Sequence, residues 1–510
     1  MSSPLNVHEW RILRCCIFSS LERRKSFIVS QKPQDNLLKS FIQFSAGPWL
    51  SAAISFVTTP ITTYLIIPTE FGKASMYTVA FSLILQAVLL GTDQSFVRMF
   101  YEYDEDKRPA LLWNSLISPL SMSVAASVVL ILFRKEISLL LFDEPSHFLP
   151  IFALSFTIVI AVLERFSTLV LRMKKRGIAF SSLRVVHTLS TAGGIIFYAL
   201  VFGRDFYAVI FGTVISHFVV LIVSVLMEIS FWRKGIWLSP SWIKRVVLYG
   251  LPFVPAFIVS WLLNSMDKLA LRSFSTFEEI GFYTAANKIV AVLLLIQTGF
   301  STFWTPVAYE THEKSPDDTS LYSRVSKLLA AVMFMVSLLL IGFKDIIVLI
   351  LDSAYLPAAN IMPFLIFYPI MYTVSETTVI GINFAKKTHW HLWISLMAAS
   401  VNFIGNSLLV PIYGAKGAAL ATGVSYVVFF YSRTLISRKL YRVDYSLMRY
   451  TMATFILIFV AFINTFNDIA LLEAGTVLIG LVLIWLIYRS ELKYSLSLLA
   501  KLMMKFRKSS

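Results

Sequence analysis

Residues Tyr249 to Glu310 read YGLPFVPAFIVSWLLNSMDKLALRSFSTFEEIGFYTAANKIVAVLLLIQTGFSTFWTPVAYE. This stretch holds two apolar runs joined by a short polar segment. At a rise of about 1.5 Å per residue, each run is long enough as a helix to cross the roughly 30 Å hydrocarbon core of a bilayer. The stretch therefore predicts a transmembrane helical hairpin, with Asp267 and Lys268 near the end of its first helix and Lys288 inside its second.

The composition excludes an ordinary soluble domain. The 510 residues are 57% hydrophobic and only 15% charged, whereas soluble domains are about 25% charged. The net charge of +16 would suggest nucleic acid for a soluble chain, but these basic residues cluster in short loops between apolar spans, which favours positive-inside topology and no nucleic-acid partner. The only cysteines, Cys15 and Cys16, are adjacent in a basic tail. No disulfide, metal site or cofactor is predicted.

The chain is predicted to be an all-α polytopic membrane protein with about 14 transmembrane helices. The apolar segments expected to form them lie at 41–67, 74–97, 110–133, 147–171, 178–202, 206–229, 246–270, 281–308, 325–351, 358–384, 389–411, 415–436, 447–466 and 469–488. With the N-terminus inside, the cytoplasmic segments hold 34 Lys and Arg residues and the external loops hold 8. This bias predicts that both termini are cytoplasmic. The three remaining basic residues, Arg165, Arg184 and Lys288, lie inside predicted spans.

Internal similarity predicts two pseudo-symmetric six-helix bundles plus two C-terminal helices. TEFGKASMYTVA around Gly72 resembles EEIGFYTAANKI around Gly281, and GRDFYAVIFGTVISH from Gly203 resembles GAKGAALATGVSY from Gly414. Because the unit holds an even number of helices, the two bundles enter the membrane in the same direction, and substrate is expected to bind between them. The predicted parts are a basic N-terminal tail, two bundles, two additional helices and a basic C-terminal tail, at 1–40, 41–240, 241–440, 441–489 and 490–510.

The motifs of this chain resemble those of the polysaccharide flippases. The residues that carry the resemblance are G-L-P, D-K-L-A-L, I-G-F-Y-T-A-A-N-K-I and F-W-T-P of the hairpin, LGTDQSFVRMFYE from Leu90 and PIYGAKGAALATGVSY from Pro411. This family comprises bacterial O-antigen, capsule and teichuronic-acid exporters of the MATE-like (MOP) superfamily, which also contains the lipid II flippase. The resemblance implies translocation of an undecaprenyl-diphosphate-linked oligosaccharide from the inner to the outer leaflet of the bacterial plasma membrane by alternating access, without enzymatic chemistry.

Such a cargo needs a polar, cationic path for its diphosphate, and charges within spans usually face a cavity or a partner. Arg184, with His187 one turn further along the same face, is a candidate diphosphate contact, because a guanidinium can bind phosphate in two places. The alternative is that Arg184 snorkels to the headgroups. Arg165 is a candidate for substrate binding or for an ion pair to another helix. Lys288 is predicted either to form a latch or gate with Asp267 or to contact glycan or phosphate, and Asn264 to hydrogen-bond sugar hydroxyls.

Three carboxylates are candidates for gating or ion coupling. Asp267 is the expected gate partner of Lys288, and Glu376 is the best embedded carboxylate for H+ or Na+ coupling, with Asp93 behind it. Asn402 and Asn406, one turn apart, are expected to hold helices together.

Two other functions remain as alternatives. A cation-coupled drug antiporter of the MATE type has the same fold, whereas an O-antigen polymerase belongs to a different class and would need a large external loop. The expected partners are the lipid-linked oligosaccharide and membrane lipids. A glycan polymerase, or glycosyltransferases docked on the basic C-terminal tail, are further candidates; the alternative role for that tail is an anchor on anionic lipid.

Overall fold

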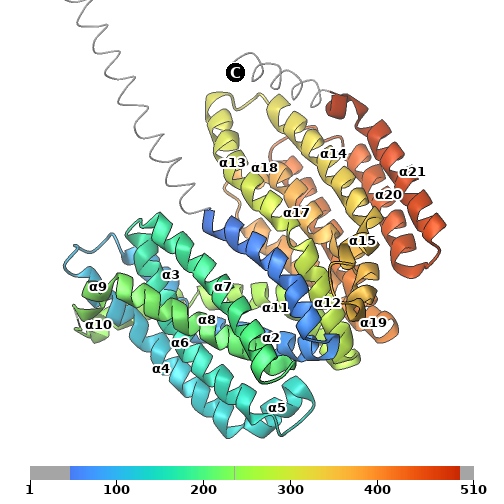
Figure 1. Ribbon diagram of the computed structural model, residues 1–510. Coiled ribbons are helices and arrows are strands. Elements are labelled where there is room, and N and C mark those ends of the chain that lie inside the picture. The colour runs from blue at the N-terminus through green and yellow to red at the C-terminus, as the bar shows by residue number, and fades with distance from the viewer. Residues whose placement is uncertain (1–45, 235, 494–510) are drawn as a thin grey trace, which may run out of the picture.

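The computed structural model describes residues 46–234 and 236–493. Within these residues every regular element is helical (Figure 1). The predicted N-terminal tail at 1–40, and all but the first few residues of the C-terminal tail at 490–510, lie outside the described residues. The predicted all-α membrane fold is confirmed.

The first half of the chain begins with helical residues 46–65, which carry no label in Figure 1. The labelled helices that follow are α2 (Pro68–Val88), α3 (Thr92–Met99), α4 (Arg108–Leu132), α5 (Arg134–Phe142), α6 (Phe148–Met173), α7 (Gly177–Val201), α8 (Phe206–Met227) and α9 (Ile229–Arg233). The chain continues with α10 (Pro240–Gly250), α11 (Phe253–Phe274), α12 (Phe277–Val290), α13 (Leu293–Lys314), α14 (Ser320–Gly342), α15 (Lys344–Val348), η1 (Ser353–Asn360), α16 (Met362–Leu365), α17 (Phe367–Thr378), α18 (Ile380–Phe384) and α19 (His389–Leu440). The chain then adds α20 (Leu447–Phe466) and α21 (Ala470–Ile487).

In the described part of the chain, 10 helices are long and apolar enough to cross a membrane, and up to 12 if each of two bent pairs is one span. The 52-residue α19 changes direction at Gly414, whose φ of 54° and ψ of −131° are not helical. Dividing α19 there, as the sequence predicts, would add one span, and the helical residues 46–65 lie where the first predicted span is expected. The number of fourteen spans stays a prediction.

Several helices predicted as continuous are broken, among them 325–351, which is divided into α14 and α15, and 358–384, which is bent by 54° after η1. The helix predicted at 74–97 ends at Val88 because Leu90 and Gly91 adopt positive φ angles, and α3 begins anew. The span predicted at 246–270 consists of α10 and α11, which are bent by 44° after Gly250, at Pro252, which has no N–H to donate. The span predicted at 281–308 is interrupted between α12 and α13, where the sequence has neither glycine nor proline to signal a break.

Each half is organised around its own buried apolar cluster. One cluster draws its residues from Ala74 to Val246, and the larger one mostly from Leu271 to Tyr488. The two groups of helices lie side by side in Figure 1, with α2 and α12 between them. Helix α10 packs against α3 and α4, whereas α11 packs against α19, so the chain passes from one half to the other at the α10–α11 bend. The boundary at residue 240 stays a prediction.

The two repeated glycines meet at the joint between α2 and α12. A Cβ atom at Gly72 would lie 1.8 Å from the Phe277 carbonyl oxygen, and one at Gly281 would lie 2.0 Å from that of Pro68. One turn further along each helix, the hydroxyl groups of Ser75 and Thr284 are 3.0 Å apart. Only glycine permits this backbone approach. The repeat therefore forms a nearly symmetric contact that closes the two halves together on the predicted outer side.

Replacing Gly281 by alanine is expected to open this joint. The added methyl group cannot fit beside the Pro68 carbonyl, and overpacking of this kind typically costs about 1–3 kcal/mol. The population of the closed arrangement should therefore fall roughly 5- to 150-fold. The distance between spin labels at Arg204 and Glu278, measured by pulsed electron resonance, should lengthen. Gly193→Ala is the matched control because a Cβ there meets nothing within 4 Å; an unchanged distance distribution in Gly281→Ala contradicts the assignment of this joint.

The two C-terminal helices are attached to the second half through a buried lysine. Helices α20 and α21 pack against α14. Lys344, only 2% exposed, places its Nζ 3.2 Å from Glu473 of α21, 3.0 Å from Asp345 and 3.0 Å from the Asn360 side-chain oxygen. The predicted pair of additional helices therefore forms one packed unit with the second half.

Lys344→Met is expected to destabilise the protein by about 3–5 kcal/mol, because it leaves the Glu473 carboxylate largely buried without its cation. The double variant Lys344→Met, Glu473→Leu should regain most of this loss, since it removes both charges. Thermal unfolding in detergent measures the effect. Lys314→Met, which breaks an exposed pair with Glu310, is the control and should cost about 0–1 kcal/mol. Equal effects of Lys344→Met and Lys314→Met contradict the account.

Candidate functional site

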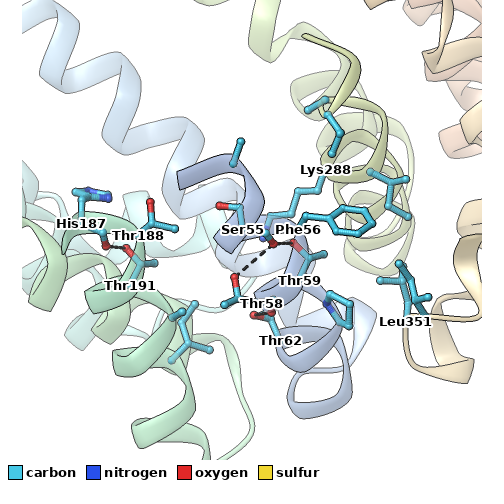
Figure 2. Close-up of a pocket in the computed structure, with 18 residues that line it drawn as sticks. Ser55, Phe56, Thr58, Thr59, Thr62, His187, Thr188, Thr191, Lys288 and Leu351 are labelled. Atoms are coloured by element: carbon cyan, nitrogen blue, oxygen red, sulfur yellow. Dashed lines mark hydrogen bonds between the residues drawn. The ribbon is translucent and has the colours of Figure 1, made fainter. Parts of the chain in front are cut away.

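A cavity of about 430 Å³, called here the central cavity, lies between the two halves (Figure 2). The first half contributes the helical residues 46–65 and α7, and the second half contributes α12, the break that follows it, and residues 350–351. Its volume suits a small polar group and is too small for a whole lipid-linked glycan.

One wall of the central cavity is a row of hydroxyl groups. Ser55, Thr58, Thr59 and Thr62 lie at helical spacing on one face and point into the cavity together with Thr188 and Thr191 of α7. The threonines of the first helix donate to backbone carbonyls one turn back, Thr59 to Ser55 at 2.7 Å and Thr62 to Thr58 at 2.9 Å. Their oxygen lone pairs stay available to accept from a ligand, as sugar hydroxyls would require.

Lys288 supplies the positive charge of the central cavity. It lies in the last turn of α12, where the helix dipole favours a cation, and its side chain is exposed to the cavity. Its Nζ also lies 4.6 Å from the centre of the Phe71 ring. Among the described residues of the wall there is no carboxylate, and His187 is the other titratable group. The wall therefore suits an anion.

The other predicted substrate residues lie elsewhere. Arg184 is exposed on α7, one turn before His187, and is not part of the cavity wall. Arg165 forms an ion pair with Asp93 of α3, at 2.7 Å and 3.1 Å from one carboxylate oxygen. The predicted ion pair between Arg165 and another helix is thus present. Its partner is Asp93, whose carboxylate therefore already has a cation bound to it.

The expected latch between Lys288 and Asp267 was wrong. Asp267 is 6% exposed, and four side chains from other helices donate to it. Asn402 and Asn406 of α19 donate to Oδ1 at 3.1 Å and 2.8 Å, while Tyr283 and Thr422 donate to Oδ2 at 2.5 Å and 2.8 Å. Neutral donors from α12 and α19 thus surround the carboxylate, which is why it does not pair with Lys288.

This Asp267 cluster could hold a hard cation. The side-chain oxygen of Asn406 is buried and has no hydrogen-bond partner, although it belongs to a side chain that donates to Asp267. The neighbouring side-chain oxygens of Asn402, Thr422 and Asp267 are of the type that Na+ and other hard cations prefer, although they take part in the hydrogen bonds of the cluster. Asn402 and Asn406 therefore do hold helices together, as expected, but around a carboxylate.

Glu376 is not a free carboxylate either. It lies 2.8 Å from Arg433 of α19, and Ser301 of α13 donates to it at 3.3 Å. Arg433 also donates to Ser375 and is 8% exposed. Arg433 lies near the end of the predicted span 415–436 and was not among the three basic residues singled out inside spans, so this pair was not predicted.

A second cavity of about 360 Å³ lies inside the second half. Asn264 lines it, as do Tyr372, Arg433, and Asn402 and Thr422 of the Asp267 cluster. Asn264 thus lies in a cavity, but one separate from Lys288, and its amide donates to the Ser260 carbonyl at 2.7 Å. The second cavity provides a polar space beside the Asp267 cluster.

Two features of the site were missed at the sequence level. The hydroxyl row shows in the sequence as Ser55, Thr58, Thr59 and Thr62, whose spacing places them on one helical face of an otherwise apolar segment. The pair of Glu164 with His217 gave no local signal, because the two residues lie on different helices, α6 and α8.

Comparisons with known proteins agree with this architecture. A family model described as "Polysaccharide biosynthesis protein" matches residues 37–312, more than half of the chain. An uncharacterized membrane protein of Methanocaldococcus jannaschii is 22% identical over 384 residues, which cover 71% of this chain and 76% of that protein.

Two solved transporters have the same fold. The lipid II flippase MurJ in an inward closed conformation matches with a TM-score of 0.65 at 17% identity, covering 89% of this chain and 99% of MurJ. A mutant of the Vibrio cholerae MATE transporter VcmN matches with a TM-score of 0.54 at 15% identity, covering 82% and 99%. The resemblance to polysaccharide exporters is thereby confirmed. The chain belongs to the polysaccharide biosynthesis protein family and has the membrane fold of the MurJ and MATE transporters.

Proposed function

We propose that this protein is a flippase that moves an undecaprenyl-diphosphate-linked oligosaccharide from the cytoplasmic to the outer leaflet of the bacterial plasma membrane. The observation that carries the proposal is the central cavity, where Lys288 faces a row of hydroxyl groups between the two halves. An amine binds diphosphate, and serine and threonine hydroxyls exchange hydrogen bonds with sugars. The lipid tail stays in the bilayer while the headgroup enters the cavity.

The closed contact between the two halves on the predicted outer side supports alternating access. The α2–α12 joint closes the predicted outer side through Gly72 and Gly281, and the Tyr355 hydroxyl donates to the Ile66 carbonyl at 2.6 Å beside it. Cargo would enter the central cavity from the cytoplasmic side and leave after this joint opens. Interfaces of this kind switch between discrete packings. Both termini are cytoplasmic in this proposal.

Coupling of transport to Na+ is part of the proposal, with the Asp267 cluster as the ion site. The unpartnered Asn406 oxygen and the side-chain oxygens beside it support Na+. Glu376 and Asp93 are ion-paired, and we assign them a structural role.

A drug antiporter of the MATE type is the second candidate because it has the same fold. The charge of the central cavity argues against cationic drugs, since the described wall holds a lysine and no carboxylate. A glycan polymerase would act on the product of this transporter and is a candidate partner. Glycan polymerisation is also the alternative function for this chain itself, and it would make the protein an enzyme.

Deletion of the gene in its own host tests the proposal. A complete undecaprenyl-diphosphate oligosaccharide should accumulate on the cytoplasmic leaflet, and the wild-type gene should restore export. Normal external repeat units that remain unpolymerised would favour a polymerase, and unchanged glycans with increased drug sensitivity would favour an antiporter.

A further inference from the structure

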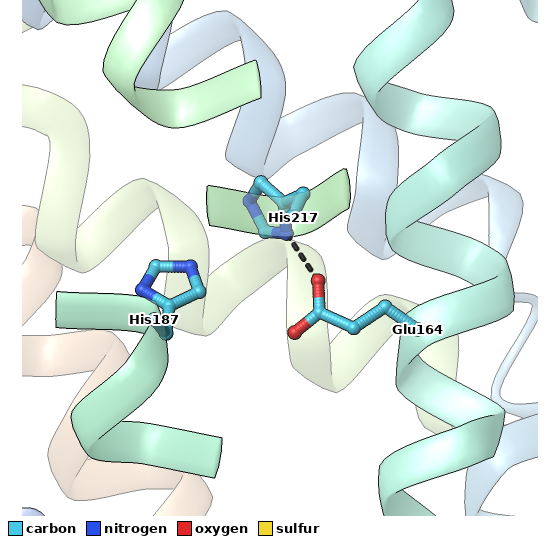
Figure 3. A group of neighbouring side chains, drawn as sticks. All are labelled: Glu164, His187 and His217. Atoms are coloured by element: carbon cyan, nitrogen blue, oxygen red, sulfur yellow. Dashed lines mark hydrogen bonds and ion pairs between the residues drawn. The ribbon is translucent and has the colours of Figure 1, made fainter. Parts of the chain in front are cut away.

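Three metal-ligand side chains from three helices of the first half converge beside the central cavity. Glu164 of α6, His187 of α7 and His217 of α8 face one another in Figure 3. One ligand atom of each lies within 4.8 Å of the other two, and His217 Nδ1 is 2.5 Å from a Glu164 carboxylate oxygen. The two imidazole rings have their centres 5.1 Å apart and are nearly perpendicular.

In the part of the chain that the structure describes, no lysine or arginine pairs with Glu164, although Arg184, one turn before His187, lies close enough for its charge to act on that imidazole. Arg165, the neighbour of Glu164 in sequence, points to Asp93 instead. Glu164 and His217 have side chains that are each 14% exposed, and the ring of Phe81 covers His217 at 5.1 Å. A carboxylate so enclosed, with imidazole groups as its near partners, suits a positively charged ligand.

We propose that Glu164, His187 and His217 bind a divalent transition-metal ion of the zinc type. Two imidazoles and one carboxylate form a ligand set that zinc accepts in proteins, with a fourth position left to water. The Ser216 hydroxyl, 3.5 Å from His187 Nε2, is placed to hydrogen-bond a ligand at that position. With metal–ligand distances of about 2.0–2.2 Å, two ligand atoms of a tetrahedral site lie roughly 3.4 Å apart. The hydrogen-bonded atoms of Glu164 and His217, now 2.5 Å apart, must therefore separate to admit the ion while His187 approaches them, and side-chain rotation provides both movements.

The ion would act on the central cavity through His187. His187 lines that cavity, whereas Glu164 and His217 lie behind it on α6 and α8. A bound ion therefore fastens α6, α7 and α8 to one another and places positive charge in the cavity wall on the side of α7. The site does not depend on the identity of the transported molecule.

Zinc binding to the purified full-length protein tests the proposal. The protein is purified without a histidine tag. The substitutions Cys15→Ser and Cys16→Ser remove the thiols of the N-terminal tail, which would compete for zinc. Equilibrium dialysis against Zn²⁺, followed by elemental analysis, should give one tightly held ion per chain. Co²⁺ should bind at the same site and report nitrogen and oxygen ligands through its visible absorption.

Loss of any one ligand should weaken the site. Even loss of an outer partner of a metal site costs about 10- to 100-fold in affinity, so Glu164→Gln, His187→Gln and His217→Gln should each lower zinc affinity by at least that much. His147→Gln is the matched control, because His147 pairs with Glu144 at 2.9 Å outside this cluster. It should bind zinc like the wild type.

Two results would overturn the proposal. Failure of the wild type to bind Zn²⁺ at micromolar concentration overturns the proposal and leaves a hydrogen-bonded pair of Glu164 and His217 beside His187. Binding that is equal in the wild type and all three cluster variants also overturns it. If His217→Gln does not fold, the isosteric Glu164→Gln decides the question. Since binding is measured without cargo, its failure leaves the flippase proposal intact.

Discussion

Lys288→Ala is expected to lower the rate of glycolipid translocation by about 10- to 150-fold while the protein still folds. Hydrogen bonds to a charged group contribute about 1.5–3 kcal/mol, and Lys288 is the lysine of the central cavity wall, which contains no described carboxylate. Its side chain is exposed to the cavity and takes part in no described salt bridge, so alanine leaves no orphaned partner. The initial rate of headgroup transfer in proteoliposomes measures the effect.

Two variants serve as controls for Lys288. Lys288→Arg keeps the charge and should retain most of the activity. Lys268→Ala removes a lysine of α11 that lies outside the central cavity wall and should act much less strongly. A Lys288→Ala protein with wild-type transport would show that the cavity does not bind the diphosphate.

Asp267→Ala is expected to destabilise the second half by about 3–5 kcal/mol, because four buried donors lose their shared acceptor. Asp267→Asn should fold, since an amide oxygen still accepts from the asparagines, but it removes the charge that would bind Na+. Thermal unfolding with and without Na+ separates the two effects. A saturating ligand at about 100 times its Kd stabilises by about 2.7 kcal/mol, so Na+ should raise the wild-type melting temperature and not that of Asp267→Asn.

Asn264→Ala is the matched control for Asp267. Asn264 lies one turn away on α11 and lines the second cavity, but it does not contact Asp267. This variant should keep the response to Na+. Equal responses of the wild type and Asp267→Asn would place ion coupling elsewhere.

The sequence predicts the membrane class and most of the spans because long apolar runs are a local signal. The predicted limits at 447–466 coincide with α20, and those at 206–229 lie close to α8. The breaks were missed both where glycine or proline marks them, at Gly91 and Pro252, and where neither does, between α12 and α13. They arise from packing against neighbouring helices, which a linear pattern does not contain.

The site was predictable only in part, for a similar reason. A lysine inside an apolar span signals function, so Lys288 could be identified, but its predicted partner Asp267 is taken by donors from α12 and α19. The internal repeat identified Gly72 and Gly281 as equivalent residues. Their contact with each other's helices depends on how the two halves meet, and this appears only in the folded structure.

Transfer of a lipid-linked glycan by the purified protein tests the central claim most directly. The full-length chain is reconstituted in liposomes that contain undecaprenyl-diphosphate oligosaccharide in both leaflets, and an added glycosidase or lectin reports the headgroups that are accessible from outside. The account predicts that headgroups from the inner leaflet become accessible with wild type and with Lys288→Arg, and much more slowly with Lys288→Ala. Accessibility no faster than in protein-free liposomes, with a folded wild-type protein and a Na+ gradient in either direction, would contradict it.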